Sequence, residues 1–205
     1  MTGTCVIVGA GEVIEEEIHV DSGDYVIAAD GGLEYLAHRG ISADMALGDF
    51  DSLGHIPEHE NLVVHPAMKD DSDMMLAVQE GLRLGWRQFR IYGGLGGRLD
   101  HTVANLQTLI YLAKQGGRGE LIGNGVHITA INNGSVQFDP AHKGYISVFC
   151  LSGRAGGVWI KGLKYTLEDA ELTSDRPLGL SNEFMGVESE IGVKNGALVI
   201  LWYDK

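Results

Sequence analysis

The pattern of apolar segments changes near residues 123–125, and this change constrains the fold more than any other feature. Before it, short apolar runs alternate with segments of helical periodicity that end near residues 38, 84 and 115. The apolar runs fall at 4–8, 25–29, 44–47, 62–65, 89–92 and 120–122. Alternating strands and helices form a mainly parallel sheet with helices on its faces. The sequence predicts an N-terminal α/β domain over 1–124.

The remainder, residues 125–205, predicts a separate all-β antiparallel domain. Strand-like segments fall at 126–132, 135–138, 145–150, 158–161, 187–193 and 197–202, with no convincing helix between them. Asn133-Gly134 and Asn195-Gly196 are typical of tight hairpin turns. Residues 179–183 form a polar stretch that predicts a loop between strands. This pattern indicates a β-sandwich or a barrel.

The motif Gly48-Asp49-Phe50-Asp51-Ser52 is the strongest candidate for chemistry. In extended or turning backbone, residues two apart point the same way, so the two carboxylates would face one point. Like charges that close are unfavourable without a cation between them, and carboxylates together with phosphate oxygens suit Mg²⁺. The same residue types also favour an ordinary turn. The motif alone leaves both interpretations open.

Two strand exits precede this motif. Gly9-Ala10-Gly11 follows the first strand, but a third glycine of a dinucleotide fingerprint is missing, so a tight strand exit is the favoured interpretation. Asp30 follows the second strand, where an open α/β sheet places its ligands. A helix N-cap explains Asp30 equally well.

Two further polar segments follow. In Lys69-Asp70-Asp71-Ser72-Asp73, Ser72 predicts the N-cap of a helix from residue 73 to about 84, and Lys69 suits either a phosphate or a surface ion pair. In residues 93–101, four of the first five positions are glycine, and Arg98, Asp100 and His101 follow. A glycine-rich turn between strand and helix lets backbone N–H groups approach an anion. No Gly-Lys-Ser/Thr follows, so this is not a Walker loop.

Composition indicates which classes of binding partner and which cellular compartment to expect. The formal net charge is −13 and no basic stripe is present, which argues against a nucleic-acid partner. The two cysteines, Cys5 and Cys150, form neither a disulfide framework nor a zinc pattern, and they fit a reducing, cytoplasmic setting. The sequence indicates no signal peptide and no transmembrane span, so no membrane association is expected.

Taken together, the motifs resemble those of the thiamine pyrophosphokinases. The matching segments occur in order along nearly the whole chain: 30–32, 48–52, 69–73, 96–101, 162–165 and 180–183. The resemblance implies a nucleotide-binding α/β domain, a C-terminal thiamine-binding β-sandwich and a homodimer with shared active sites. It implies Mg²⁺-dependent transfer of the pyrophosphoryl group of ATP to the hydroxyl of thiamine, yielding thiamine diphosphate and AMP.

The resemblance also assigns roles to individual positions. The metal would be held by Asp49, Asp51 and Asp73. The nucleotide would lie near Asp30, Gly31, Lys69, Arg98 and His101. The reacting centre would be lined by Asp70, Ser72, Asp73 and Asp100. The thiamine pocket would be shaped by Tyr165, Ser181 and Asn182. Some family members carry Trp at the Tyr165 position and a Gln-containing acidic motif in place of residues 69–73.

The chemistry agrees with these assignments and leaves one choice open. Phosphoryl transfer needs alignment and charge neutralisation, which the metal carboxylates and the Arg98 guanidinium would supply. Either Asp100 or Asp70 could orient the thiamine hydroxyl or take its proton. An aromatic wall such as Tyr165 suits the permanent positive charge of thiamine.

Two other classes of function fit parts of the sequence. Asp49-Phe50-Asp51 resembles the Asp-x-Asp signature of metal-dependent phosphatases of the haloacid dehalogenase type, in which the first Asp is the nucleophile. Those enzymes have a hydrophobic strand directly before the motif, and residues 43–48 make a poor one. A non-catalytic nucleotide- or thiamine-binding sensor is the other alternative.

Overall fold

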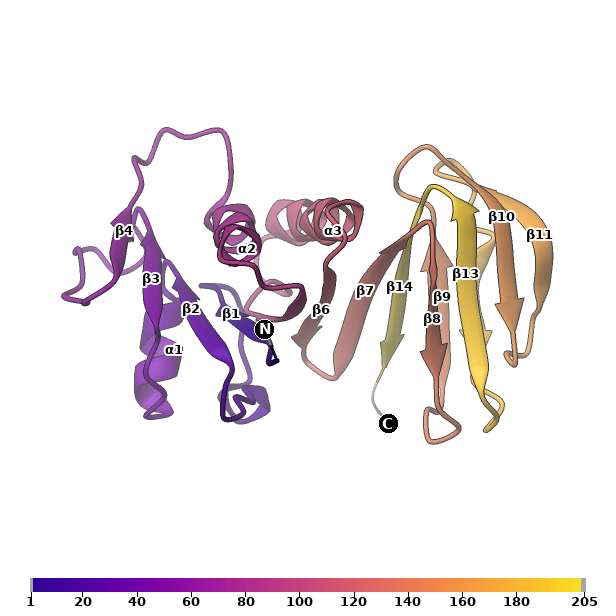
Figure 1. The fold of residues 1–205 in the computed structure, drawn as a ribbon, viewed down its shortest axis with the longest axis horizontal. Coiled ribbons are helices and arrows are strands. Elements are labelled where there is room, and N and C mark those ends of the chain that lie inside the picture. Colours follow the sequence, from indigo (N-terminus) through magenta and orange to yellow (C-terminus); the bar gives the residue numbers. More distant parts are fainter. Residues whose placement is uncertain (1, 204–205) are drawn as a thin grey trace. The chain divides into compact units, whose positions relative to one another are not determined.

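The computed structural model describes residues 2–203 and begins with a parallel sheet (Figure 1). Its strand order is β5-β1-β2-β3-β4, and every neighbouring pair runs parallel. The strands are β1 (Cys5–Val8), β2 (Tyr25–Ala29), β3 (Met45–Gly48), β4 (Leu62–Val64) and β5 (Gln88–Tyr92). The helical segments are η1 (Glu15–Glu17), α1 (Gly32–His38), α2 (Asp73–Arg83) and α3 (Leu99–Lys114). The predicted mainly parallel α/β region is confirmed.

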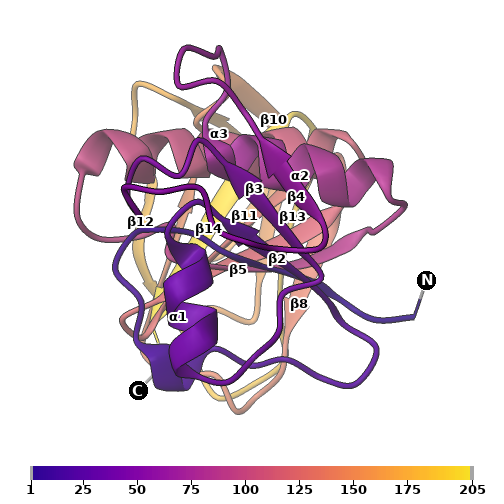
Figure 2. The ribbon, with the colours of Figure 1, turned by 90° about the vertical axis from the view of Figure 1, so that its left-hand side faces the viewer.

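Helices α1 and α2 cover opposite faces of this sheet (Figure 1, Figure 2). Val6, Val26 and Ala46 share a core cluster with Leu36 of α1. On the other face, Gly81 of α2 lies so close to β1 and β5 that an added Cβ would come within 3.0 Å of Cys5 Sγ. The central strands β1 and β2 are buried on both faces and read as continuous apolar runs, which is the pattern that predicted them.

By compactness the chain divides into two units. The first comprises the residues up to Thr108 together with Leu121–Asn124, and the second comprises Leu109–Glu120 and the residues from Gly125 onward. The division therefore falls within α3 and within β6 (Arg118–Gly123). The functional boundary between residues 124 and 125 stays a prediction. Within residues 2–203, no helix is long and apolar enough to cross a membrane.

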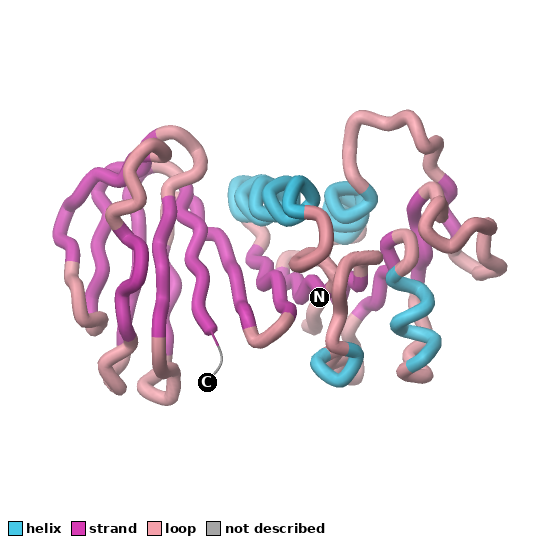
Figure 3. The backbone as a smooth tube through the Cα atoms, turned by 180° about the vertical axis from the view of Figure 1, so that it is seen from behind, coloured by secondary structure: helices cyan, strands magenta, loops and turns pink. Residues whose placement is uncertain are grey.

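The second unit contains antiparallel sheets, and Figure 3 shows strands and loops but no helix from residue 126 to residue 203. One run of strands has the order β12-β9-β14-β7, and the other sheet has the order β11-β10-β13-β8. The strands are β7 (Val126–Asn132), β8 (Ser135–Phe138), β9 (Tyr145–Phe149), β10 (Arg154–Lys161), β11 (Leu167–Thr173), β12 (Gly179–Glu183), β13 (Ser189–Asn195) and β14 (Ala197–Tyr203). One buried cluster joins Val148 and Ile200 of the first run to Ile160 and Ile191 of the second. Since both runs share this core, the predicted sandwich is confirmed.

The two Asn-Gly turns are not the hairpins that the sequence predicted. The Asn133-Gly134 turn joins β7, which pairs with β14, to β8, which pairs with β13. The turn at Gly196 joins β13 to β14 in the same way, so each turn carries the chain from one sheet to the other. The two turns hydrogen-bond each other, since Gly196 N donates to Asn133 Oδ1 at 2.9 Å and Asn133 N donates to Gly196 O at 3.1 Å.

Two strands were not predicted from the sequence. Residues 179–183, expected as a loop, form β12, and β11 was not predicted. Both lie at sheet edges, and β11 carries three acidic residues, Glu168, Asp169 and Glu171. Edge strands commonly carry charged and polar side chains, which discourage pairing with other chains. Neither segment therefore shows the alternation of apolar and polar residues from which a strand is predicted.

Candidate functional site

Three carboxylates meet at the carboxyl ends of β2 and β3. One oxygen from each of Asp30, Asp49 and Asp51 lies within 4.8 Å of the other two. Asp30 is 8% exposed, and its Oδ1 is buried without a hydrogen-bond partner among the described residues. A buried acceptor without a donor is costly, and hard divalent cations prefer carboxylate oxygens. This group, called the acidic cluster below, therefore fits a metal ion.

Local backbone conformation brings these carboxylates together. Phe50 has a φ of 56° and is 1% exposed, so it anchors the loop in the core that contains α1. Asp49 and Asp51 flank it and share the acidic cluster, as the two-residue spacing predicted. Gly48 has a φ of +147°, and a Cβ there would lie 3.1 Å from the backbone of Asp30. Asp30 itself has a φ of 51°, and its N–H donates to Leu47 O at 2.8 Å.

Lys69 links the acidic cluster to the start of α2. Its Nζ lies 3.0 Å from Asp49 Oδ2 and 2.7 Å from Asp73 Oδ1. Hydrogen bonding from Lys69 lowers the pKa of Asp49. Burial raises the pKa of Asp73 and outweighs the opposing effect of Lys69. Burial alone would lower the pKa of Lys69, but its hydrogen bonds to Asp73 and Asp49 leave that pKa raised.

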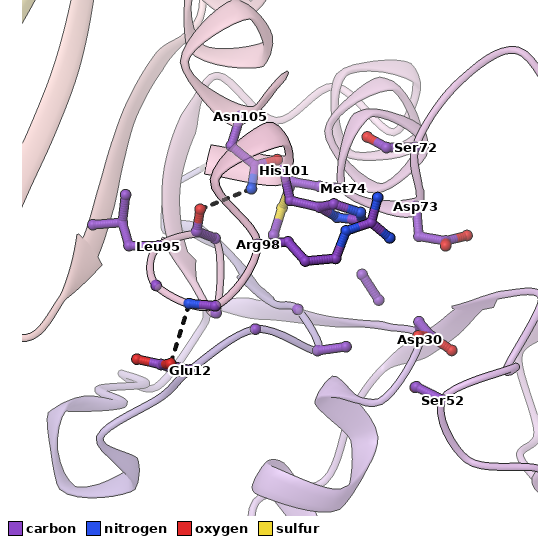
Figure 4. Close-up of a pocket in the computed structure, with 18 of the residues that line it drawn as sticks. Glu12, Asp30, Ser52, Ser72, Asp73, Met74, Leu95, Arg98, His101 and Asn105 are labelled. Carbon is purple, nitrogen blue, oxygen red and sulfur yellow. Dashed lines mark hydrogen bonds between the residues drawn. The ribbon is translucent and has the colours of Figure 1, made fainter. Parts of the chain in front are cut away.

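A cavity of about 500 Å³ opens in the first unit beside these residues (Figure 4). Several predicted site residues line it: Asp30, Asp51, Ser72, Asp73, Arg98 and His101. In Figure 4, the Arg98 side chain extends from the glycine-rich segment toward the side where Ser72 and Asp73 lie. Ser72 also caps α2, since its Oγ accepts a hydrogen bond from Met75 N at 3.2 Å. The cavity wall thus carries both acidic groups and the cationic Arg98 side chain.

Glycines from two strand exits form another wall of the cavity. Gly9 N donates to Tyr92 O at 2.9 Å, and Gly11 N donates to Gly93 O at 3.0 Å. The approach is so close that a Cβ on Gly93, whose φ is +68°, would lie 2.3 Å from Gly9 O. Residues 9–11 therefore belong to the cavity wall, although the sequence favoured a plain strand exit.

Glu12 and Asn105 also line the cavity, and the sequence analysis named neither. Glu12 Oε1 accepts a hydrogen bond from Gly97 N at 3.1 Å. Asn105, which is 7% exposed, donates from Nδ2 to Gly94 O at 2.8 Å. Both hold the glycine-rich segment in place. No local signal marks either residue, because their partners are backbone atoms brought near by folding.

The other predicted residues of the first unit lie outside the cavity wall. Asp100 lies at the start of α3 with an exposed side chain. Its Oδ2 is 2.5 Å from Nη2 of Arg98, whose side chain is also exposed. This pairing lowers the pKa of Asp100. Asp70 is exposed as well, and neither Asp70 nor Asp100 is among the described residues that line the cavity. Gly31, at the N-cap of α1, is buried beside Ser52.

The second unit brings together Tyr165, Ser181 and Asn182. Asn182 is 4% exposed; it accepts a hydrogen bond from Tyr165 N at 2.9 Å and donates to Tyr165 O at 2.7 Å. Ser181 has a φ of 59°, and its N–H donates to Ser147 Oγ at 3.1 Å. Tyr165 is 60% exposed. Asn182 thus holds the backbone that presents this ring.

Comparison with protein families gives matches in both halves of the chain. The family described as "Thiamin pyrophosphokinase, catalytic domain" matches residues 18–118, a range that includes the acidic cluster and Arg98. The family described as "Thiamin pyrophosphokinase, vitamin B1 binding domain" matches residues 135–200, a range that includes Tyr165, Ser181 and Asn182.

Similar proteins cover most of the chain. The thiamine pyrophosphokinase of Bacillus subtilis (strain 168) is 30% identical over 185 residues, which is 85% of each sequence. A crystal structure of thiamine pyrophosphokinase from Bacillus subtilis has a TM-score of 0.85 at 27% identity, covering 98% of this chain and 99% of that one. A thiamin pyrophosphokinase family protein from Enterococcus faecalis has a TM-score of 0.79 at 26% identity, covering 98% and 99%.

Proposed function

This chain belongs to the thiamine pyrophosphokinase family and has thiamine pyrophosphokinase activity, and we propose that Mg²⁺ and the residues around the acidic cluster support its reaction. The pyrophosphoryl group of ATP passes to the hydroxyl of thiamine, giving thiamine diphosphate and AMP. The observation that carries the assignment of the site is the acidic cluster beside a glycine-walled cavity with Arg98.

In this proposal the cavity of the first unit takes ATP. Its glycines allow the backbone to lie close to a polyphosphate chain. The Arg98 guanidinium exchanges its exposed contact with Asp100 for a phosphate, to which it can present a planar fork of donors. His101 lies on the same side of the cavity (Figure 4).

The acidic cluster fits a divalent cation because the buried Asp30 Oδ1 has no donor within residues 2–203 and two further carboxylates converge on it. We assign Asp30, Asp49 and Asp51 as its ligands, and Asp73 as the carboxylate that holds Lys69 beside them. When bound, Mg²⁺ would neutralise charge on the phosphate oxygens. The chain's own residues align the phosphates and keep the ligands in place.

The proton of the thiamine hydroxyl is assigned to Asp100 or Asp70. Both carboxylates are exposed. The hydrogen bond from Arg98 lowers the pKa of Asp100, and once Arg98 has turned to a phosphate the Asp100 carboxylate is available to accept the proton. Asp70 directly follows Lys69 and precedes the α2 N-cap by two residues.

Thiamine binding is assigned to the second unit, where the exposed Tyr165 ring would stack on the cationic ring. Replacing Tyr165 with alanine is expected to raise the KM for thiamine by about threefold to thirtyfold, the range for one cation–π contact. The KM for ATP should stay unchanged. Steady-state kinetics with each substrate varied in turn measures both values, and Tyr165→Trp, which keeps an aromatic wall, is the matched control. An unchanged KM for thiamine in the alanine variant would show that Tyr165 does not contribute to thiamine binding.

We also propose a homodimer with active sites shared between subunits. Exposed apolar side chains gather on and beside the edge strand β12: Tyr145, Leu178, Leu180, Met185 and Val187. An apolar group of this kind at a sheet edge suits an interface. Light scattering should give twice the chain mass of 22.1 kDa. A monomer with full turnover would contradict the proposal.

A cytoplasmic location is part of the same proposal. Cys5 and Cys150 are both buried as free thiols, and reduced cysteines are the usual state in that compartment.

ATP labelled at its γ-phosphorus distinguishes the reaction from a phosphatase. The proposal expects the label in thiamine diphosphate and none on the protein. A labelled Asp49 would instead indicate the phosphoenzyme of an Asp-x-Asp phosphatase. Binding of both substrates without any transfer of label would indicate a sensor.

A further inference from the structure

Lys69 occupies an unusual electrostatic position between two carboxylates. Its Nζ donates to Asp49 Oδ2 at 3.0 Å and to Asp73 Oδ1 at 2.7 Å. The side chains of Lys69, Asp49 and Asp73 are 13%, 14% and 21% exposed. Ion pairs that are mostly shielded from water interact more strongly than surface pairs. This ammonium group therefore contributes strongly to the balance of charge around the cavity.

Asp49 belongs to two groups at once. It is a partner of Lys69 and a member of the acidic cluster with Asp30 and Asp51. Asp30 Oδ1 is buried and has no hydrogen-bond partner in the part of the chain that the structure describes, so the cluster retains an unused acceptor even with Lys69 in place. A divalent cation bound among these three carboxylates would share the Asp49 carboxylate with the positively charged Lys69. Two cations on one carboxylate repel each other, so their occupancies must be coupled.

We propose that Lys69 is an internal counter-ion that holds Asp49 and Asp73 in the metal-free protein and leaves Asp49 when a divalent cation binds. The i, i+4 contact with Asp73 at the start of α2 gives the ammonium group a partner to keep after it leaves Asp49. As an extension that rests on the proposed function, the released Nζ stays on Asp73, which lines the cavity, and is there available to the polyphosphate chain of ATP. Lys69 is thus a positioning residue that couples metal binding to phosphate binding.

A static role predicts the opposite response to mutation. If Lys69 only kept the carboxylates in place, its removal would let them separate and would weaken metal binding. If Lys69 competes with the cation, its removal tightens metal binding because the cation no longer has to displace a charge. The sign of the change in affinity therefore separates the two roles.

The test measures Mn²⁺ binding to the protein without nucleotide, by calorimetry and by the electron paramagnetic resonance of free Mn²⁺. We expect Lys69→Met to bind Mn²⁺ roughly tenfold more tightly than the unmodified chain, within the usual range for two coupled sites. The matched control is Lys194→Met, which removes a 2.7 Å pair with Asp169 whose side chains are 63% and 70% exposed. The control should leave Mn²⁺ affinity unchanged. Equal or weaker binding by Lys69→Met would overturn the proposal.

Thermal unfolding supplies a second readout that does not depend on turnover. Without metal, Lys69→Met should unfold at a lower temperature than the unmodified chain, because its carboxylates then repel one another. Saturating Mn²⁺ should raise its unfolding temperature by more than it raises that of the unmodified chain, and an equal rise would also contradict the proposal. If Lys69→Met does not fold without metal, Lys69→Gln replaces it in both measurements. Tighter Mn²⁺ binding in a protein that makes no thiamine diphosphate would support the exchange and refute only the proposed function.

Discussion

Replacing Asp51 with asparagine is expected to lower kcat by about a thousandfold, because the site then loses one of its converging carboxylates. The side chain keeps its size and a hydrogen-bonding oxygen but loses the charge that attracts a divalent cation. Asp51 is exposed, and the loop that carries it is anchored by the buried Phe50, so the fold should survive the change. The free energy of unfolding should change by less than about 0.5 kcal/mol, as is usual for exposed positions.

The measurement is initial-rate kinetics across a range of Mg²⁺ concentrations, together with urea unfolding of the same preparation. Asp169→Asn is the matched control, since it removes an exposed carboxylate that pairs with Lys194 in the second unit. This control should keep normal kcat. Near-normal turnover by Asp51→Asn at ordinary Mg²⁺ would refute the metal assignment, whereas a large loss of stability would make the kinetic result uninformative about the metal.

Replacing Gly93 with alanine is expected to lower the free energy of unfolding by about 2–4 kcal/mol, which is large for one methyl group. Two causes combine. Gly93 has a φ of +68°, which disfavours any L side chain, and its Cβ would lie 2.3 Å from Gly9 O. Neither backbone can move freely, because Gly11 N donates to Gly93 O within the same contact. ATP affinity should fall too, since both strand exits line the cavity.

Gly97→Ala separates the two causes. Gly97 has a φ of +59°, but a Cβ there would meet nothing within 4 Å. This variant should therefore cost only about 1 kcal/mol, the penalty of the left-handed backbone alone. Urea titrations of both variants, followed by circular dichroism, give the comparison. Equal losses of stability would show that the close approach of the two strand exits contributes nothing.

Sequence reasoning predicted the features that depend on local pattern. Continuous apolar runs predicted β1 and β2, and Ser72 predicted the start of α2. The convergence of Asp49 and Asp51 followed from their spacing and is present in the structure. These features need only the periodicity of the backbone and the chemistry of single residues.

Features that depend on distant partners could not be predicted in this way. Asp30 joined the acidic cluster because β2 and β3 are neighbours in the sheet, whereas its own surroundings in sequence fitted an N-cap equally well. Glu12 and Asn105 act on backbone atoms 85 and 11 residues away. The edge strand β12 lacks an apolar alternation. The Asn-Gly turn at residues 133–134 looks the same in sequence whether the two strands it joins pair with each other or lie in different sheets.

The most direct test of the central claim is to incubate the purified protein with ATP, Mg²⁺ and thiamine and to quantify AMP and thiamine diphosphate in the same sample. The account predicts equal amounts of both products, formed only when all three components are present. AMP without thiamine diphosphate, or hydrolysis of ATP that does not require thiamine, would contradict it.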